Sequence, residues 1–292
     1  MTVAGVLWGT IGPAAAIVQE HTSLSPLQTS FWRLLVAILP VAGMAWLAGR
    51  GRERPTASAL LFGAMVGSFT GASQLAYFAA VDDSGIAIPT LVANGLGPIL
   101  TALGQTVIFR SRPDSRTLLS LAAALAGLAL LVLDGPKDVT GTGLLLSVGS
   151  ALAYACSTLA AGPASRRMDV TVLNAASIAG GACAMLPFVL LTGGPGLADS
   201  AAGWAGLIHL GLVVSGLSYA LYYSAARSLP STHLSILALL DPLVSAVIAI
   251  AFFDEALTPG AVVGGALMLC AVAALSHEDE EEPPPIPAAV GE

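Results

Sequence analysis

Long apolar segments separated by short polar stretches dominate this chain of 292 residues. Segments of about 20 residues, the length that crosses a hydrocarbon core of roughly 30 Å, recur with little interruption. With the polar stretches taken as ends, the pattern predicts ten helices, at residues 3–19, 27–49, 57–80, 86–109, 117–133, 142–162, 170–191, 203–226, 231–252 and 259–275. The sequence therefore predicts a protein that crosses a membrane many times.

The apolar runs are helical in character. Strands of a membrane β-barrel alternate apolar and polar residues, whereas "LAAALAGLALLVL" (residues 121–133) is apolar on every face. Composition agrees, since 55% of residues are hydrophobic, 10% are charged and the mean hydropathy is +0.83, far from the averages of soluble domains. The predicted fold class is an all-α polytopic membrane protein with ten transmembrane helices.

Basic residues gather on one side of this predicted topology. Arginines follow the second, fourth, sixth and eighth helices: Arg50, Arg52, Arg54, Arg110, Arg112, Arg116, Arg166, Arg167 and Arg227. The opposite loops hold Lys137 and acids instead: Glu20, Asp82, Asp83, Asp134, Asp138, Asp199, Asp254 and Glu255. Because short cytoplasmic loops are enriched in Lys and Arg, both termini are expected in the cytoplasm. Residues 277–292 are acidic and proline-rich, and we expect a disordered cytoplasmic tail there.

The chain repeats itself with an offset of 144 residues. "VANGLGPILTALGQTVIF" from Val92 aligns with "ILALLDPLVSAVIAIAFF" from Ile236, so that Pro98 falls on Pro242 and Gly97 on Asp241. We interpret residues 1–136 and 137–276 as two five-helix repeats. Five is odd, so the second repeat enters the membrane from the opposite side. Inverted repeats with a binding site at the midplane are typical of secondary transporters.

An Asp-Pro pair lies near the middle of the ninth predicted helix. Asp241 is about ten residues from either end, and an ionisable residue at that depth is by default a functional candidate. Pro242 removes a backbone donor and clashes with the carbonyl group of Ala238, which predicts a polar kink. Asp241 is also the candidate for coupling transport to protons. The alternative is a structural role at a helix crossing.

Arg33, about seven residues into the second helix, is another charge within the membrane. Three roles are open for it: an ion pair with Asp241, a bond to an anionic group of the cargo, or snorkelling to the outer interface near Glu20 or Asp82.

Further polar and aromatic residues fall inside predicted helices and complete a candidate substrate site. With Asp241, Pro242 and Arg33, the set comprises Trp8, Gln74, Tyr77, Asn94, Pro98, Tyr219, Tyr222 and Ser235, and Tyr154 is a related candidate. Gln74 and Tyr77, like Tyr219 and Tyr222, are three residues apart and share a helix face. Polar residues also bind helices to one another in membranes, so helix packing is the alternative for each.

Metal and nucleotide chemistry have no motif here. Cys156, Cys183 and Cys270, and likewise His209 and His233, lack the spacing of zinc ligands. No phosphate-binding Gly-x-x-x-x-Gly-Lys loop occurs, so we expect no metal, no cofactor, no ATP-driven step and no nucleic-acid partner. The expected partners are the lipid bilayer, a small-molecule substrate, and protons or an exchange substrate. No particular oligomeric state is predicted.

Several short motifs resemble those of a known family. They are "LWGT" (residues 7–10), Arg33 within "FWRLLVA", "LLDP" (residues 239–242) and "FFDEALTP" (residues 252–259). Together they resemble the drug/metabolite transporter superfamily, in its EamA-type branch of ten helices. "WGT" is followed here by the unusual "IGP", and the first repeat lacks the acid-Leu-Thr-Pro turn. The resemblance implies transport of amino acids, metabolites or drugs.

The sequence thus predicts a secondary transporter, an exporter of small organic molecules in a bacterial inner membrane, and not an enzyme. An intramembrane hydrolase is one alternative. It would use Ser218, but His209 is nine residues away on the same helix, about 13 Å in rise, which leaves His233 as its base. A passive channel is the other alternative, although a channel does not need an inverted repeat.

Overall fold

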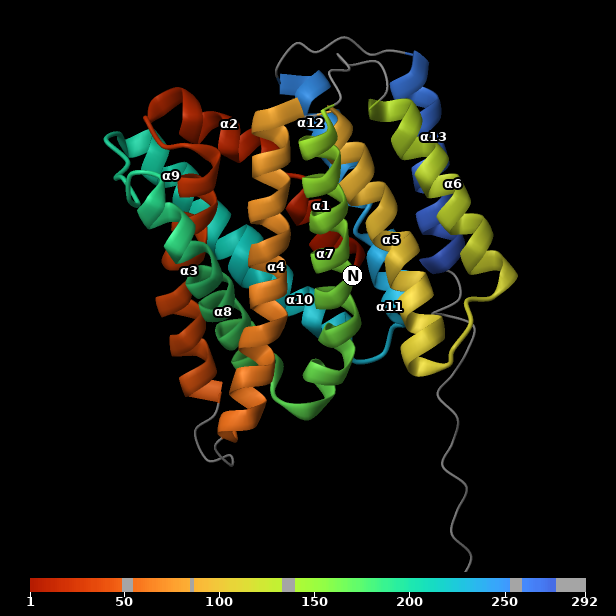
Figure 1. The fold of residues 1–292 in the computed structure, drawn as a ribbon, viewed down its shortest axis with the longest axis horizontal. Coiled ribbons are helices and arrows are strands. Elements are labelled where there is room, and N and C mark those ends of the chain that lie inside the picture. The colour runs from red at the N-terminus through yellow and green to blue at the C-terminus, as the bar shows by residue number, and fades with distance from the viewer. Residues whose placement is uncertain (49–54, 85–86, 133–139, 253–258, 277–292) are drawn as a thin grey trace, which may run out of the picture.

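The computed structural model describes residues 1–48, 55–84, 87–132, 140–252 and 259–276, and all regular elements within these ranges are helices (Figure 1). They are α1 (Thr2–Trp8), α2 (Ile11–His21), α3 (Pro26–Ala48), α4 (Ala57–Ser84), α5 (Ala87–Phe109), α6 (Ser115–Val132), α7 (Gly141–Arg167), α8 (Val170–Leu191), α9 (Ala201–His209), the π-helix η1 (Leu210–Leu217), α10 (Ser218–Ala225), α11 (Ser231–Leu237), α12 (Leu240–Phe252) and α13 (Pro259–Ser276).

Each of the ten predicted segments coincides with helix. Eight helical stretches in the described ranges are long and apolar enough to cross a membrane, and two shorter apolar helices lie at Ser115–Leu130 and Val262–Ala274. The prediction of an all-α polytopic membrane protein is confirmed. The predictions for Arg50, Arg52, Arg54, Asp134, Lys137, Asp138, Asp254, Glu255 and the tail 277–292 fall outside the described residues.

Polar side chains at the loop ends set where several helices begin. The side chains of Thr140, Asp169 and Ser200 each precede a helix and accept a hydrogen bond from a backbone N–H in its first turn, at 3.0, 2.9 and 3.0 Å. Asp114 does the same for α6, where its carboxylate accepts from the Thr117 N–H at 2.8 Å. Such caps satisfy donors that a helix leaves unpaired at its N-terminus, so they fix the loop boundaries.

Helices α4, α7 and α8 pack closely at the centre of the bundle. Small residues make this possible: a Cβ atom at Gly67 on α4 would overlap the backbone of Ser177 on α8, and one at Gly180 would overlap the backbone of Ala64. Close backbone approach through glycine is how helices associate in lipid, where the hydrophobic effect does not drive them together. The α6–α13 pair lies at one edge of the bundle, away from α3 and α9 (Figure 1).

Three of the membrane-crossing stretches are interrupted. The first breaks at Gly9 and Thr10 between α1 and α2, the eighth contains the π-helix η1, and the ninth breaks at Ala238 and Leu239. These interruptions are neighbours, because α1 contacts η1, α10 and α12. In contrast α5 continues through Pro98, and α3, α7 and α8 also contain proline without a break. Proline alone therefore does not decide where a helix is interrupted.

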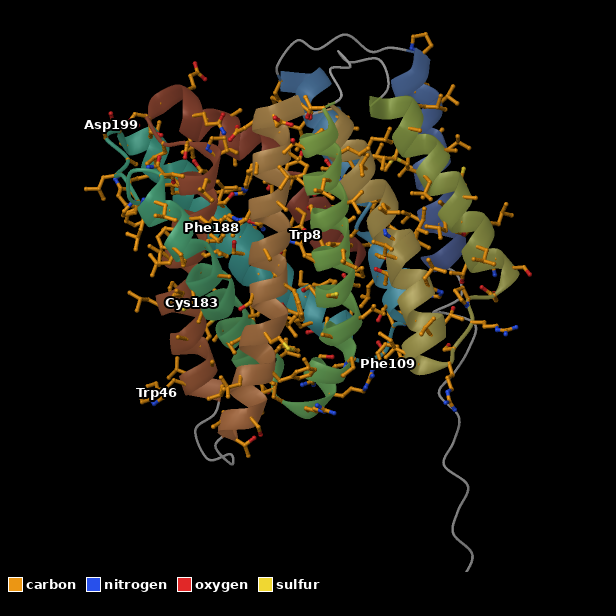
Figure 2. The ribbon with its side chains drawn as sticks, in the orientation of Figure 1. Trp8, Trp46, Phe109, Cys183, Phe188 and Asp199 are labelled. Atoms are coloured by element: carbon orange, nitrogen blue, oxygen red, sulfur yellow. The ribbon has the colours of Figure 1, made fainter. Side chains whose placement is uncertain are left out.

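Aromatic and acidic side chains mark the two ends of the bundle (Figure 2). Trp46 near the end of α3 and Phe109 at the end of α5 lie at the same end, and Asp199 lies at the opposite end. Arg110, which directly follows Phe109 at the end of α5, therefore belongs to the end of the bundle opposite Asp199.

Candidate functional site

The interruption at Asp241 has a specific backbone arrangement. Pro242 has no N–H, and the Ala238 carbonyl that such a group would bind accepts instead from the Asp241 N–H at 3.0 Å. A further tight turn joins the Leu239 N–H to the Ile236 carbonyl at 3.0 Å. Asp241 thereby falls in the first turn of α12, where the helix dipole favours a negative charge. The predicted polar kink is present.

Asp241 is half-buried within the bundle. Its carboxylate makes no hydrogen bond to any described residue, but it interacts electrostatically with Arg33 and with the hydroxyl groups of Tyr77, Tyr154 and Tyr219. These residues come from α3, α4, α7 and α10, so Asp241 lies within electrostatic range of four helices besides its own. A carboxylate with no protein donor is available to water, to a proton or to a cargo.

Arg33 on α3 is buried, with 4% of its surface exposed. Its burial rules out snorkelling to the outer interface. Its guanidinium interacts electrostatically with Tyr219 and Asp241, while its Nε atom is buried without a hydrogen-bond partner among the described residues. A charged donor left without an acceptor inside a protein is costly, so this group is suited to receive an acceptor from a ligand.

Tyr219 connects these charges to an aromatic cluster. Its ring lies edge-on to Trp8, with ring centroids 5.2 Å apart, and Tyr222 lies 5.4 Å from Trp8. Tyr223 completes the cluster and its hydroxyl group is 2.5 Å from the Ser177 hydroxyl group. Figure 2 shows Trp8 inside the bundle, unlike Trp46 at its lower end. Trp8 is therefore not an interfacial anchor.

A small cavity adjoins Tyr219 between α3, α4, α8 and α10. It has room for about one water molecule, and its lining comprises Leu34, Gly67, Thr70, Gly71, Gln74, Ser177, Ile178, Gly181 and Tyr219. The Oε1 atom of Gln74 is buried and has no hydrogen-bond partner in the described part of the chain. In this conformation the cavity is too small for a metabolite, and its mostly apolar lining includes one unused acceptor, the Gln74 Oε1 atom.

The predicted site residues divide into two groups. Asp241, Arg33, Tyr77 and Tyr219 are brought together electrostatically, and Gln74 shares a cavity with Tyr219. Three other predicted residues do not line that cavity. Ser235 is buried and donates its hydroxyl hydrogen to the Thr232 carbonyl at 2.8 Å, which is a bond within its own helix. Asn94 is half-buried and Pro98 buried on α5, which packs on α7 and α11, and neither lines the cavity.

Trp8 and Tyr222 do not line the cavity, but both contact Tyr219, which does. Both are almost fully buried, at 8% and 5% exposure, and pack on Tyr219 instead of lining the cavity. Their contacts position Tyr219.

Sequence reasoning missed the small residues of the site. Gly67, Gly71, Gly181 and Ser177 line the cavity, and Thr70 joins α4 to α7 through a 2.8 Å hydrogen bond with Ser157. The spacing of Gly67 and Gly71, four residues apart on one helix face, is a signal for a close helix crossing. It does not identify a cavity.

The histidines and Ser218 have other roles. The Nε2 atom of His209 lies 2.9 Å from the Thr10 hydroxyl group, and that of His233 lies 3.1 Å from the Thr117 hydroxyl group. Ser218 donates to the Val213 carbonyl at 2.9 Å. The serine needed by the hydrolase alternative is thus bonded to its own helix backbone. In the described ranges His, Cys, Asp and Glu side chains do not gather in groups of three or more.

Comparisons with known proteins agree with this architecture. A model of the EamA-like transporter family matches residues 1–133 and 141–277. The uncharacterized transporter YwfM of Bacillus subtilis is 26% identical over 275 residues, covering 91% of this chain and 89% of the relative. The uncharacterized inner membrane transporter YicL of Salmonella typhimurium is 26% identical, covering 92% and 91%. An uncharacterized transporter of Archaeoglobus fulgidus is 25% identical, covering 93% of each.

A solved structure, titled "Crystal structure of protein", shares the fold. Its TM-score is 0.80 at 19% sequence identity, and the match covers 94% of this chain and 96% of that one.

Proposed function

Since this chain belongs to the EamA-like transporter family, we propose that it is a secondary transporter that exports small organic metabolites, amino acids or drugs across the bacterial cytoplasmic membrane. The observation that carries the proposal is that two opposite charges, Arg33 and Asp241, lie within electrostatic range of each other inside the bundle, beside a helix interruption. Intramembrane charges are costly and mark substrate or proton pathways. Neither charge has a hydrogen bond to a described residue that would explain it as a structural pair.

Helix packing supports two inverted repeats at 1–136 and 137–276. A twofold operation that exchanges the repeats converts the packing of α4 on α7 into that of α9 and α10 on α2 and α1, and both occur. It likewise converts the packing of α5 on α7 into that of α12 on α1 and α2, and it returns the α3–α8 and α6–α13 pairs to themselves. Units related in this way can exchange conformations, which is the basis of alternating access.

Each helix interruption occurs in only one member of a pair of equivalent helices. The first, eighth and ninth stretches are interrupted, whereas their counterparts in the other repeat, α7, α4 and α5, are continuous. Alternating access by exchange of repeat conformations requires such a difference. In the opposite state α4, α5 and α7 would bend and the first, eighth and ninth stretches would straighten. The small cavity beside Tyr219 would then open for cargo.

Asp241 is the candidate for coupling. A half-buried carboxylate without a protein donor is able to bind either a proton or a positively charged group of the cargo. If the two compete, transport in one direction is tied to proton movement in the other. Exchange of one cargo for another is the alternative source of energy, because the sequence contains no phosphate-binding loop.

The test is a comparison of metabolites in medium and cells. Cells expressing the native protein are compared with cells carrying empty vector, under several nutrient conditions and with growth matched. We expect at least one small organic compound to accumulate in the medium only when the protein is present. Equal metabolite profiles under all conditions would contradict the export proposal. A non-saturating flux of that compound would favour a channel instead.

A further inference from the structure

The eighth membrane-crossing stretch contains an unusual helical segment. Residues Leu210–Leu217 form the π-helix η1, between α9 and α10. π-helices have i→i+5 hydrogen bonds, are rare, and occur frequently at functional sites. Here both the backbone N–H and the hydroxyl group of Ser218 donate to the Val213 carbonyl, five residues earlier. The wide turn therefore immediately precedes Tyr219, the residue that connects the charges to the cavity.

A buried amide on a neighbouring helix binds this wide turn. The Nδ2 atom of Asn174 on α8 donates to the Gly216 carbonyl at 2.7 Å. Asn174 is 1% exposed, and its Oδ1 atom is buried without a hydrogen-bond partner among the described residues. Burying half of an amide unsatisfied costs free energy. An apolar residue of the same shape would avoid that cost, so packing alone does not explain an asparagine here.

The other end of η1 is pressed against α3. A Cβ atom at Gly211 would lie 2.7 Å from the Val36 Cγ1 atom and 3.0 Å from the Arg33 carbonyl oxygen. The π-helix is thus held between the backbone at Arg33 on one side and the Asn174 amide on the other. η1 therefore contacts α3, which carries Arg33, and α8, which contributes residues to the cavity lining.

Changing the wide turn into an ordinary α-turn would rotate everything that follows it. One residue of an α-helix corresponds to about 100° of rotation about the helix axis. A π-helical turn holds about one residue more than an α-helical turn. If the same residues of η1 adopted α-helical hydrogen bonds, α10 would therefore rotate by about that angle. Tyr219, which lines the cavity, would point elsewhere. Tyr222 would lose its contact with Trp8.

We propose that Asn174 is a positioning residue, whose hydrogen bond to the Gly216 carbonyl holds η1 in the π-helical register that places Tyr219 at the cargo cavity. The inference rests on the proposed function only in calling the cavity a cargo site. Which residues Tyr219 contacts can be tested without a known cargo.

The test measures cross-linking between two cysteines that replace cavity residues. In a variant whose native cysteines Cys156, Cys183 and Cys270 are replaced by alanine, Gln74→Cys is combined with Tyr219→Cys. Both positions line the same small cavity. A bifunctional thiol reagent with a spacer of about 10 Å, the rise of the seven helical residues between the level of Ser177 and Gln74, is applied to the protein in membranes. The proteins compared carry either Asn174 or Asn174→Leu, which has nearly the same shape and no amide.

The matched control pairs Gln74→Cys with Ser177→Cys. Both of these positions line the cavity, but they lie on α4 and α8 and not on the stretch that contains η1. We expect Asn174→Leu to slow the 74–219 cross-link several-fold and to leave the 74–177 cross-link unchanged. Ser218→Ala, which removes the other side-chain bond of the wide turn, is expected to slow the 74–219 cross-link in the same way.

Three results would overturn the proposal. The first is an unchanged 74–219 cross-link in Asn174→Leu. The second is an equal loss of both cross-links, which would assign Asn174 a general structural role. The third is a native protein whose 74–219 pair fails to cross-link while the 74–177 pair does. Because the cross-linking measurement uses no cargo, its result can be interpreted even if the protein is found not to export metabolites.

Discussion

Arg33 and Asp241 interact electrostatically inside the bundle, and neither side chain makes a hydrogen bond to a described residue. Removing one of two opposite charges inside a bundle leaves the other uncompensated and is destabilising. We expect Arg33→Met to lower the apparent melting temperature of the purified protein, and Arg33→Met combined with Asp241→Asn to recover most of the loss. The coupling in this double-mutant cycle should reach about 1–3 kcal/mol. Additive effects of the two substitutions would contradict the pairing.

The α4–α8 crossing should tolerate no side chain at Gly67. A Cβ atom there overlaps the Ser177 backbone, so Gly67→Ala should reduce the free energy of unfolding by about 2 kcal/mol or more. Gly149→Ala on α7 is the matched control, since a Cβ atom there has nothing within 4 Å. Alanine should stabilise that helix by about 0.5–1 kcal/mol. Thermal unfolding in detergent measures both, and equal melting temperatures would disprove the close crossing.

The amide of Gln74 should matter for transport and the hydroxyl group of Ser235 should not. Gln74 lines the cavity with an unused acceptor, so Gln74→Leu is expected to reduce the export rate of the identified compound several-fold. Ser235→Ala loses only a bond within its own helix and should export at the native rate. Export at matched protein levels is the measurement, and the opposite ranking would place the site along α11 instead.

Asp114 makes the start of α6 sensitive to pH. The hydrogen bonds from Thr117 lower the pKa of the Asp114 carboxyl below its usual value. A group whose pKa is lower in the folded state stabilises the fold above the unfolded pKa, about 3.9, and loses that contribution as pH falls through the folded pKa. Asp114→Ala should cost about 1 kcal/mol at neutral pH, and the difference should shrink in acid, where the protonated carboxyl is a weaker acceptor.

Asp114→Asn is the control for this pH dependence, because it keeps the cap and does not titrate. Melting temperatures at neutral and acidic pH are compared for the three proteins. A constant difference between native protein and Asp114→Ala across this range would contradict a role for the ionised carboxyl.

Much of the fold was predictable from sequence because the membrane fixes helix length. The predicted segment 170–191 coincides with α8, and 231–252 spans α11 and α12. The break at Asp241 was also predictable, since proline removes a donor and aspartate marks a polar environment. The π-helix η1 was not, because "LGLVVSGL" has no composition that distinguishes it from an ordinary membrane helix.

The site was predictable in part. Asp241, Arg33 and Tyr219 are unusual in lipid and were identified by type alone, yet of the three roles open for Arg33 only the snorkelling role is removed by its burial. Ser235 has the same polar character as Ser177, and only their positions in space separate a bond within one helix from a cavity wall. The contribution of Gly71 and Gly181 depends on how α4 crosses α8, which no local pattern contains.

If Asp241 takes part in moving cargo, as we propose, its replacement should abolish transport. The most direct measurement is uptake of the identified compound into proteoliposomes at several pH values, with native protein and Asp241→Asn at equal protein content and confirmed folding. We expect saturable, pH-dependent uptake by the native protein and loss of that uptake in Asp241→Asn. A full rate with unchanged pH dependence in Asp241→Asn would contradict it and leave Asp241 as a structural group.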